Sequence, residues 1–394
     1  MIRHVNPAVA LMDESVIREM TRVAEDHDAI NLAQGYPELP VPETVLDAAR
    51  RALAEGQHRY TRTWGDPLLR RELADFLADR WDSRFDPETE LVITCGASEA
   101  IMAALMALLS PGDKAVVPEP IYENYLPGIR LAGARPAILR VDPFTGEWDA
   151  AQLARDLRDA RVMVLNTPAN PSGKVWTRDE LEVIADLVVK NDAVLITDET
   201  YAFITEHENA HVPPATVGAL APRTVTIVSF SKTYAVTGWR VGFAAAPEPL
   251  MGAIRKVHDF LTVCAPAPFQ TALREALRLP DDYYAGVRSA YRRRHDLLSA
   301  GLERAGWRVN RPSGTYFLLV DVRDLGIPDD REWAVRLVHE RGVAGVPGSA
   351  FLWGGMPRED GAPPDRRGTF LRLSFGKEER LLRQAIHRLA AGPP

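Results

Sequence analysis

The sequence predicts an α/β protein in which a largely parallel sheet is covered by helices on both faces. Two observations favour this class. Short runs of β-branched and other apolar residues recur along the middle of the chain, and between them apolar residues follow the spacing of an amphipathic helix. Several of the short runs are almost continuously apolar, which is typical of strands buried on both faces. The expected strands are residues 91–94, 114–117, 162–166, 193–197, 224–229 and 240–245.

Three helices before and between these strands have recognisable ends. Residues 177–190 carry a helical apolar stripe, and Thr177 with Glu180 forms a capping box at its start. An Asp-Pro pair at 66–67 places a helix cap before a proline in the first helical position. A third helix is expected at 98–109, where a Pro-Gly pair follows two residues later. Strands that alternate with helices in this way predict a parallel sheet.

From about residue 280 the pattern changes and predicts a second, smaller α+β unit. A long charged helix at 281–305 comes first. Residues 354–368, rich in Gly, Pro and charged side chains, are expected to form a surface loop. The first forty residues are expected to join this unit. Its other expected elements are strands at 315–322, 343–346 and 369–375 and a terminal helix at 377–391.

The composition excludes several classes of protein. The 394 residues include 47 Lys and Arg against 54 Asp and Glu, a formal net charge of −7. An acidic chain lacks the clustered cations that hold nucleic acid, and we interpret the basic run at 292–294 as a solvated helix face. No stretch approaches 18 uninterrupted apolar residues, so no membrane span is expected.

The compartment is indicated by the cysteines and by the start of the chain. Cys95 and Cys264, the two cysteines, cannot build a disulfide framework or a cysteine-rich zinc site. The N-terminus shows no secretory apolar region and no evident cleavage site. We therefore expect a cytoplasmic protein.

The strongest local signal for chemistry is Lys232, in a Ser-Phe-Ser-Lys-Thr-Tyr segment directly after the expected strand 224–229. A lysine at the carboxyl end of a core strand can point its amine into the crevice where open α/β sheets bind ligands. Ser229 and Ser231 offer hydroxyls, and Arg240 follows eight residues later. This set suits a phosphorylated aldehyde, because the amine can form a Schiff base while hydroxyls and guanidinium hold the phosphate. The alternative is a surface lysine after a strand.

Three further turns also follow expected strands. Asp198 could pair with a protonated ring nitrogen, although it could equally cap a helix or solubilise the sheet edge. Asn170 stands in an Asn-Pro-Ser-Gly sequence that could also be an ordinary turn. Gly96, Ala97 and Ser98 join a strand to a helix, whose N-terminal N–H groups can bind an anion. Such strand-glycine-helix turns are common in α/β proteins.

Other cofactor and metal signatures are absent from the sequence. No G-x-G-x-x-G follows an expected strand, and no G-x-x-x-x-G-K-[ST] occurs. Neither H-E-x-x-H nor a paired-cysteine spacing is present, and the nine histidines are scattered, so no metal site is expected.

Taken in chain order, these elements resemble the fold type I pyridoxal-phosphate enzymes, most of all the class I/II aminotransferases, over essentially the whole chain. The spacings agree: 28 residues separate Asn170 from Asp198, 34 separate Asp198 from Lys232, and 8 separate Lys232 from Arg240. Four flanking segments resemble family elements as well: Asn-Leu-Ala-Gln-Gly-Tyr-Pro at 31–37, His-Arg-Tyr-Thr-Arg-Thr-Trp-Gly at 58–65, Pro-Gly-Ser-Ala-Phe at 347–351 and Leu-Arg-Leu-Ser-Phe at 371–375. The first two are most similar to the kynurenine, glutamine and methionine aminotransferase branch.

The resemblance implies a fold and an assembly. A large cofactor domain, residues 46–284, would contain a mostly parallel, seven-stranded sheet sandwiched by helices. Residues 1–45 plus 285–394 would form the small α+β domain from both chain ends. The family resemblance also implies a homodimer, because Tyr60 of the partner subunit would complete each active site.

The resemblance also implies a role for each matching residue. Lys232 would hold pyridoxal 5′-phosphate as an internal aldimine and move the proton during catalysis, and Asp198 would pair with the ring nitrogen. Tyr201 and Asn170 would hydrogen-bond the 3′ oxygen, and Tyr122 would stack on the ring. The phosphate would be held by the turn Gly96, Ala97, Ser98, by Ser229, Ser231 and Arg240, and by Tyr60 of the partner subunit.

The substrate pocket departs from the pattern of this branch. Arg372 would bind the α-carboxylate bidentately, with Gly35 and Asn170 nearby. Tyr36 and Trp64 stand where phenylalanine is more usual, and Thr-Tyr-Ala at 200–202 replaces the commoner Val-Tyr-Glu. The side-chain specificity therefore stays open, and Trp64 could instead be a packing residue.

The leading functional hypothesis is an aminotransferase that moves an amino group between an L-α-amino acid and a 2-oxo acid. The same cofactor residues would also serve C–S lyases, cyclopropane-forming synthases and oxygen-using arginine oxidases or hydroxylases. A regulator that senses pyridoxal phosphate is a more remote alternative. Such regulators carry a basic DNA-binding domain before this region, and only about thirty residues precede the glycine segment here.

Overall fold

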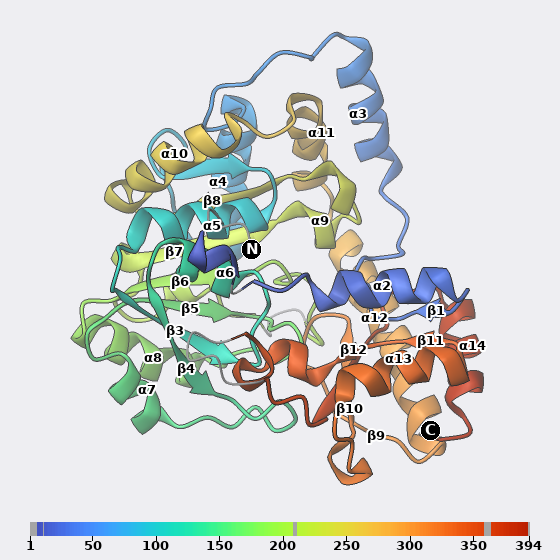
Figure 1. Cartoon of the computed structure of the whole chain (residues 1–394). Helices are drawn as coiled ribbons and strands as arrows, with labels where there is room; N and C mark the ends of the chain where they lie inside the picture. The colour runs from blue at the N-terminus through green and yellow to red at the C-terminus, as the bar shows by residue number, and fades with distance from the viewer. Residues whose placement is uncertain (1–5, 11, 208–210, 358–363, 393–394) are drawn as a thin grey trace.

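A computed structural model describes residues 6–10, 12–207, 211–357 and 364–392 (Figure 1). Its largest sheet has seven strands in the order β2-β8-β7-β6-β5-β3-β4. All neighbouring pairs are parallel except those of β8, which runs antiparallel to both β2 and β7. The prediction of a mostly parallel sheet is therefore confirmed. The strands are β2 (Leu91–Thr94), β3 (Lys114–Glu119), β4 (Arg135–Arg140), β5 (Ala160–Asn166), β6 (Val194–Asp198), β7 (Thr224–Ser229) and β8 (Gly242–Ala245).

Helices cover both faces of this sheet, as its alternating side chains require. In β5, Val162 and Val164 pack into one hydrophobic core, and Met163 and Leu165 pack into another. The first core is closed by α5 (Ala97–Leu108), α6 (Tyr125–Leu131) and α10 (Glu248–Thr262). The opposite face is covered by α4 (Pro67–Trp81), α7 (Ala150–Asp156), α8 (Arg178–Lys190) and α11 (Ala267–Leu277), and α3 (Glu43–Ala54) packs on α11.

The predicted helix ends are confirmed. Asp66 caps α4 and accepts a hydrogen bond from the Leu69 N–H at 2.8 Å, with Pro67 in the first helical position. Thr177 and Glu180 form both hydrogen bonds of the capping box at the start of α8. These ends agree with expectation because side-chain capping is a local property of the sequence.

Two strand predictions for this sheet need correction. The edge strand β4 was not expected, because it starts with Arg-Pro, ends with arginine and contains only three consecutive apolar residues. An edge strand tolerates proline and polar side chains, so it lacks the pattern of a core strand. The strand expected at 240–245 begins only at Gly242, because Arg240 adopts a left-handed φ of 54°.

The rest of the chain forms a smaller α+β unit from both chain ends, on the right and lower right of Figure 1. Its four-stranded sheet has the order β12-β13-β10-β9, and its two-stranded sheet pairs β1 with β11. The strands are β1 (Ile30–Asn31), β9 (Arg308–Val309), β10 (Phe317–Asp321), β11 (Val343–Ala344), β12 (Val346–Pro347) and β13 (Phe370–Ser374). The helices of this unit are α2 (Val16–Asp26), α12 (Asp281–Arg304), α13 (Asp330–Arg341) and α14 (Glu379–Leu389). Two short helices, α1 (Pro7–Ala10) and α9 (Phe230–Thr233), lie outside it.

The single strand expected at 343–346 is wrong, because this stretch contains two strands of different sheets. Val343–Ala344 pairs with β1, and Val346–Pro347 pairs with β13. Gly345 lies between them, and a Cβ atom at this position would come within 2.8 Å of Leu371 Cγ. A close approach to β13 therefore separates the two strands, and this tertiary contact leaves no periodic signal in the sequence.

The structure describes only part of the expected loop at 354–368. Residues 358–363 of the loop lie outside the described residues, while 364–368 have no regular structure. One hydrophobic core joins α2 and β1 to α12, α13, α14 and the small sheets. This core supports the division into 46–284 and 1–45 plus 285–394, which stays a prediction.

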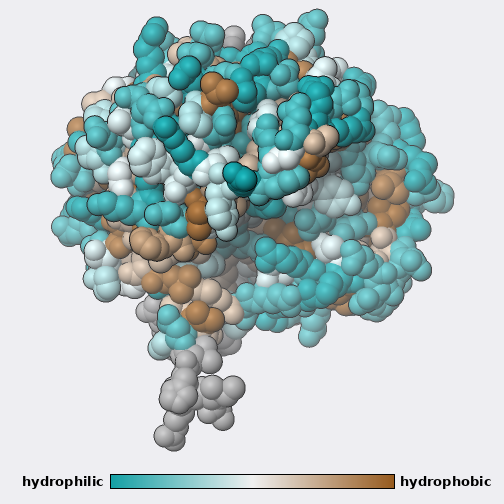
Figure 2. All heavy atoms as spheres, turned by 90° about the horizontal axis from the view of Figure 1, so that it is seen from above, coloured by the Kyte–Doolittle hydropathy of each residue, from teal (hydrophilic) through white to brown (hydrophobic). Residues whose placement is uncertain are grey.

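The surface agrees with the acidic, polar composition. The face seen in Figure 2 is mostly hydrophilic and is interrupted by separate hydrophobic patches. Within the described parts of the chain, no helix is long and apolar enough to span a lipid bilayer.

Candidate active site

A cavity of about 450 Å³ lies at the carboxyl ends of β5, β6 and β7. Asn166, Asp198 and Ser229 are the last residues of these three strands, and all three line the cavity. Parallel strands end at one edge of a sheet, so side chains far apart in sequence meet there. The structure brings thirteen of the expected site residues to this cavity: Gly35, Tyr36, Ala97, Ser98, Tyr122, Asn170, Asp198, Tyr201, Ser229, Ser231, Lys232, Arg240 and Arg372.

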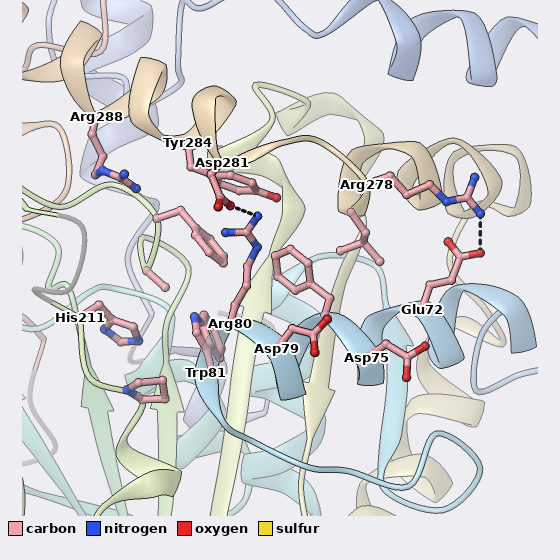
Figure 3. A pocket seen from close by; sticks show the side chains of 15 residues that line it. Glu72, Asp75, Asp79, Arg80, Trp81, His211, Arg278, Asp281, Tyr284 and Arg288 are labelled. Carbon is pink, nitrogen blue, oxygen red and sulfur yellow. Dashed lines mark hydrogen bonds and ion pairs between the residues drawn. The ribbon is translucent and has the colours of Figure 1, made fainter.

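A wider cavity of about 590 Å³ lies elsewhere, between α4, α12 and the segment that contains Ala202 and His211 (Figure 3). It contains none of the expected site residues. Several of its charged side chains already form ion pairs, including Arg80 with Asp281 and Arg278 with Glu72, both at 2.7 Å. The smaller cavity is therefore the candidate active site.

Lys232 lies on the short helix α9, three residues after the end of β7. Its Nζ donates a hydrogen bond to the Gly35 carbonyl at 2.9 Å. Burial, with the neighbouring charges of Arg240 and Arg372, lowers the pKa of Lys232 to about 8, against the opposing effect of Asp198. A lysine with this pKa has a substantial neutral fraction in mildly alkaline solution, and neutral amine is the form that acts as nucleophile or base.

Asp198 is buried at the end of β6, and burial raises the pKa of its carboxyl. Tyr125 donates its hydroxyl proton to Asp198 Oδ2 at 2.9 Å, and the Thr200 N–H donates to Oδ1 at 3.1 Å. Asn166 donates to the Asp198 carbonyl at 2.8 Å and accepts from the Asn170 N–H at 2.7 Å. The carboxyl is therefore held in one orientation, facing a cavity where a cation would favour its ionised form.

Arg372 enters the cavity from β13, with 1% of the residue exposed. Its two terminal nitrogens donate to Asn170 Oδ1 at 2.8 Å and to the Ala33 carbonyl at 2.6 Å. The guanidinium carbon lies 4.1 Å from the Phe317 ring centroid and 5.0 Å from that of Phe351. Burial lowers the pKa of Arg372 to about 10, so the group stays cationic at neutral pH. The buried Nε has no hydrogen-bond partner within the described structure, which leaves a donor for an anionic ligand.

The turn before α5 has the features of an anion site. Gly96 has a φ of 79°, and its helix cap has no side-chain hydrogen bond. A Cβ atom on Gly96 would lie 2.5 Å from Arg240 Nη2, so glycine is needed for the guanidinium to approach the turn. The first N–H groups of a helix have no intrahelical partner. Ser231 Oγ is buried and has no hydrogen-bond partner among the described residues.

Two tyrosines complete the cavity wall. Tyr122 packs edge-on against Tyr125, with ring centroids 5.6 Å apart, and accepts a hydrogen bond from Asn124 at 3.2 Å. Tyr201 packs edge-on against Tyr316 at 5.4 Å. Burial raises the pKa of both Tyr122 and Tyr201, so their hydroxyls stay protonated and can donate hydrogen bonds.

Three expected residues do not line this cavity. Gly96 is not among the lining residues, although it allows Arg240 to approach the turn, as described above. Tyr60 is 81% exposed, and Trp64 is also exposed, with the guanidinium of Arg255 4.3 Å from the Trp64 ring centroid. The contribution of Tyr60 to a partner's site stays a prediction, as does that of Trp64 to substrate binding.

Several cavity residues were not expected from the sequence, and some of them had a detectable signal. Asn166 pairs in register with Asp198 at the ends of neighbouring strands, so the end of the strand at 162–166 could have indicated it. Tyr125 does not line the cavity itself, but it is the first residue of α6, three residues after Tyr122, and it donates a hydrogen bond to Asp198. Gln34 and Thr200 belong to the segments 31–37 and 200–202, which the sequence had already indicated. The others carry no local signal, because the chain fold alone brings them to the cavity: Ser15, Ile17, Arg18, Ile101, Glu123, Thr237, Gly238 and Phe317.

The comparisons with known proteins agree with this geometry. The sequence profile of the family "Aminotransferase class I and II" matches residues 27–389. The chain is 36% identical over 380 residues to a probable N-succinyldiaminopimelate aminotransferase, DapC, from Mycobacterium tuberculosis, with 95% of each chain covered. It is 32% identical over 377 residues to the methionine aminotransferase of Escherichia coli, again with 95% of each covered.

The fold comparison gives the same result. The solved structure of N-succinyldiaminopimelate aminotransferase from Mycobacterium tuberculosis superposes with a TM-score of 0.92 at 35% identity, covering 98% of this chain and 99% of that one. These findings confirm the resemblance on which the site residues were assigned. The chain therefore belongs to the class I and II aminotransferases, and it is a pyridoxal-phosphate-dependent aminotransferase of fold type I.

Proposed function

We propose that the 450 Å³ cavity is the active site, in which the chain moves an amino group between an L-α-amino acid and a 2-oxo acid. The observation that carries this proposal is the convergence of Lys232, Arg240 and Arg372 with Asp198 in one cavity. A low-pKa lysine provides the nucleophile and base, and two separate guanidinium groups can hold two separate anions.

The residues present fit pyridoxal phosphate. The unpartnered Ser231 hydroxyl and the close approach of Arg240 to the Gly96 turn suit its phosphate. Ser229, Ala97 and Ser98 would add a hydroxyl and N–H groups, and Tyr60 of the partner subunit would complete the phosphate site. When bound, the cofactor supplies an electron sink that stabilises negative charge at the substrate Cα.

The catalytic side chains would have separate roles. Lys232 would carry the cofactor and, when displaced by substrate, move the proton between the substrate Cα and the cofactor C4′. Asp198 would hold the proton on the ring nitrogen, oriented by the hydrogen bond from Tyr125. Tyr201 and Asn170 would hydrogen-bond the 3′ oxygen, and Tyr122 would pack on the ring face.

The α-carboxylate of the substrate would bind Arg372, beside Gly35 and Asn170. A Cβ atom on Gly35 would lie 2.5 Å from Phe317 Cζ, so glycine is needed where this segment passes the ring under Arg372. We propose that Tyr36 and the partner subunit's Trp64 adjoin the substrate side chain.

We also propose that the protein is a cytoplasmic homodimer. Phe260 on α10 is 91% exposed. Tyr60 lies in a neighbouring loop, because His258 on α10 forms a hydrogen bond to the carbonyl of Thr63 in the same loop, at 2.7 Å. Two large apolar side chains on adjacent elements support an interface with a second copy. The thiol of Cys95 contacts the Cys264 carbonyl at 3.8 Å, and both cysteines are free, as in a reducing compartment.

A single half-reaction tests the activity. Protein with bound cofactor, mixed with an amino acid and no oxo acid, should release one equivalent of 2-oxo acid per active site and then stop. Adding a 2-oxo acid should restore the original absorbance spectrum of the cofactor. Lys232→Ala should slow this step by at least about 10³-fold, because the base is lost. Continuous ammonia release, with or without oxygen uptake, would instead indicate a lyase or an oxidase.

Replacing Arg372 tests the carboxylate site. Arg372→Ala should lower kcat/KM about 100-fold or more for every amino donor, because the α-carboxylate of the substrate loses its buried cationic partner. Arg372→Lys should recover only part of this loss, because lysine lacks the planar fork that binds a carboxylate bidentately. Steady-state kinetics with several donors checks this, with cofactor content measured by absorbance. An unchanged KM in Arg372→Ala would contradict the assignment.

The lowered pKa of Lys232 predicts a pH-dependent stability in the cofactor-free protein. The pKa is about 8 in the folded chain and 10.5 for an ordinary lysine, so between these values the unfolded state binds more protons. The lysine therefore destabilises the fold below pH 8, and this penalty disappears as the pH rises to 10.5. Lys232→Met should be more stable than the wild-type protein at pH 7.5, by at most about 3 kcal/mol, and the advantage should vanish near pH 10.5. Urea unfolding at several pH values measures it, and a constant difference would contradict the buried, low-pKa amine.

A further inference from the structure

A buried acid–base pair lies next to the turn of Gly96, Ala97 and Ser98, which we call the phosphate turn. Neither residue of the pair lines the cavity described above. Glu99 of α5 and His258 of α10 meet at 2.5 Å between Oε1 and Nδ1, with 8% and 0% of their side chains exposed. The other ring nitrogen, Nε2, contacts the Thr63 carbonyl at 2.7 Å. A carbonyl can only accept, and an ionised carboxylate can only accept, so both ring nitrogens donate and His258 is an imidazolium.

The titration of His258 agrees with this assignment. Burial alone would lower its pKa, but the hydrogen bond and the charge of Glu99 outweigh burial and raise the pKa above its ordinary value. The hydrogen bond to the Thr63 carbonyl acts in the same direction. The direction of this shift favours the imidazolium form of His258.

Glu99 also forms a hydrogen bond to the backbone of Cys95, the residue directly before the phosphate turn. Its second oxygen, Oε2, accepts the Cys95 N–H at 2.5 Å. The backbone carbonyl of Cys95 accepts a hydrogen bond from Arg240 Nη2 at 3.4 Å. The N–H and the carbonyl of Cys95, one on each side of its Cα, are thus both held, which fixes the direction of the chain into Gly96 and leaves the N–H groups of Ala97 and Ser98 for a ligand.

This arrangement places a carboxylate next to an anion site. Glu99 is in the first turn of α5, where the helix N-terminus attracts negative charge. A phosphate at the same helix end would be repelled by an uncompensated carboxylate, most strongly because Glu99 is shielded from water. A cation beside Glu99 removes this repulsion, and His258 is the group that forms an ion pair with it.

We propose that His258 is a positioning residue for the phosphate group of the cofactor: its charge cancels that of Glu99, so that Glu99 can hold the Cys95 peptide without repelling the phosphate. The inference rests on the proposed function, which places the phosphate at the turn of Gly96, Ala97 and Ser98. The same imidazolium ties Thr63, and with it the loop that carries Tyr60, to this turn.

The affinities of cofactor-free protein for pyridoxal 5′-phosphate and for pyridoxal separate the phosphate from the ring. His258→Gln keeps a hydrogen-bonding side chain and removes the charge, so the dissociation constant for pyridoxal phosphate should rise at least 10-fold, while that for pyridoxal changes less than about threefold. Glu99→Gln removes the carboxylate that needs compensation, and its amide can still accept the Cys95 N–H. This variant and the Glu99→Gln/His258→Gln double variant should both bind pyridoxal phosphate within about threefold of the wild-type protein.

His295→Gln is the matched control, because His295 also pairs with an acid, Asp296, at 3.0 Å, but on α12 away from the turn. It should leave both affinities unchanged. A purely structural role for the pair predicts that both single variants weaken binding alike and that the double variant is at least as weak; this result would overturn the inference. Equal affinities of His258→Gln and the wild-type protein for pyridoxal phosphate would overturn it too. If the wild-type protein itself does not prefer pyridoxal phosphate to pyridoxal, the proposed phosphate site fails instead.

Discussion

The parallel register of β5, β6 and β7 is the constraint on which the active site depends. Asn166 is paired with Asp198 in this register, and Ser229 ends the next strand at the same edge of the sheet. Three side chains from distant parts of the sequence therefore surround one cavity, and the short helix that follows β7 adds Lys232. A shift of one residue would turn Asp198 to the opposite face of the sheet, away from Lys232. The hydrophobic cores on both faces of the sheet thus hold the catalytic groups in place.

A positive site exists within an acidic protein because charge is distributed unevenly. The formal net charge is −7, yet the cavity is lined by Arg18, Lys232, Arg240 and Arg372. Burying Arg372 is unfavourable unless its donors are satisfied. Two hydrogen bonds and two aromatic rings offset much of this cost, and the remaining Nε donor suits a carboxylate. In the proposed function, the small unit would supply the carboxylate site and the large sheet would supply the cofactor site.

The sequence predicted those features that depend on local patterns or on ordered motifs. Apolar runs located the core strands, and caps located the starts of α4 and α8, because both signals reside in adjacent residues. Edge strand β4 and the break at Gly345 were missed, because solvent exposure and a tertiary contact determine them. Within the site, the motif residues were found, but Phe317 and the Glu99–His258 pair were not. These residues function through neighbours that are distant in sequence, and no spacing along the chain indicates such contacts.

The central claim is that Lys232 is the residue that carries the cofactor. Borohydride reduction of the protein with bound cofactor, followed by proteolysis and mass spectrometry, tests this most directly. The account predicts that the pyridoxyl group is found on Lys232, at a stoichiometry near one per chain, because Lys232 is the lysine that lines the cavity and its pKa is lowered to about 8. Recovery of the pyridoxyl group mainly on another lysine, such as Lys174 or Lys377, would contradict the account.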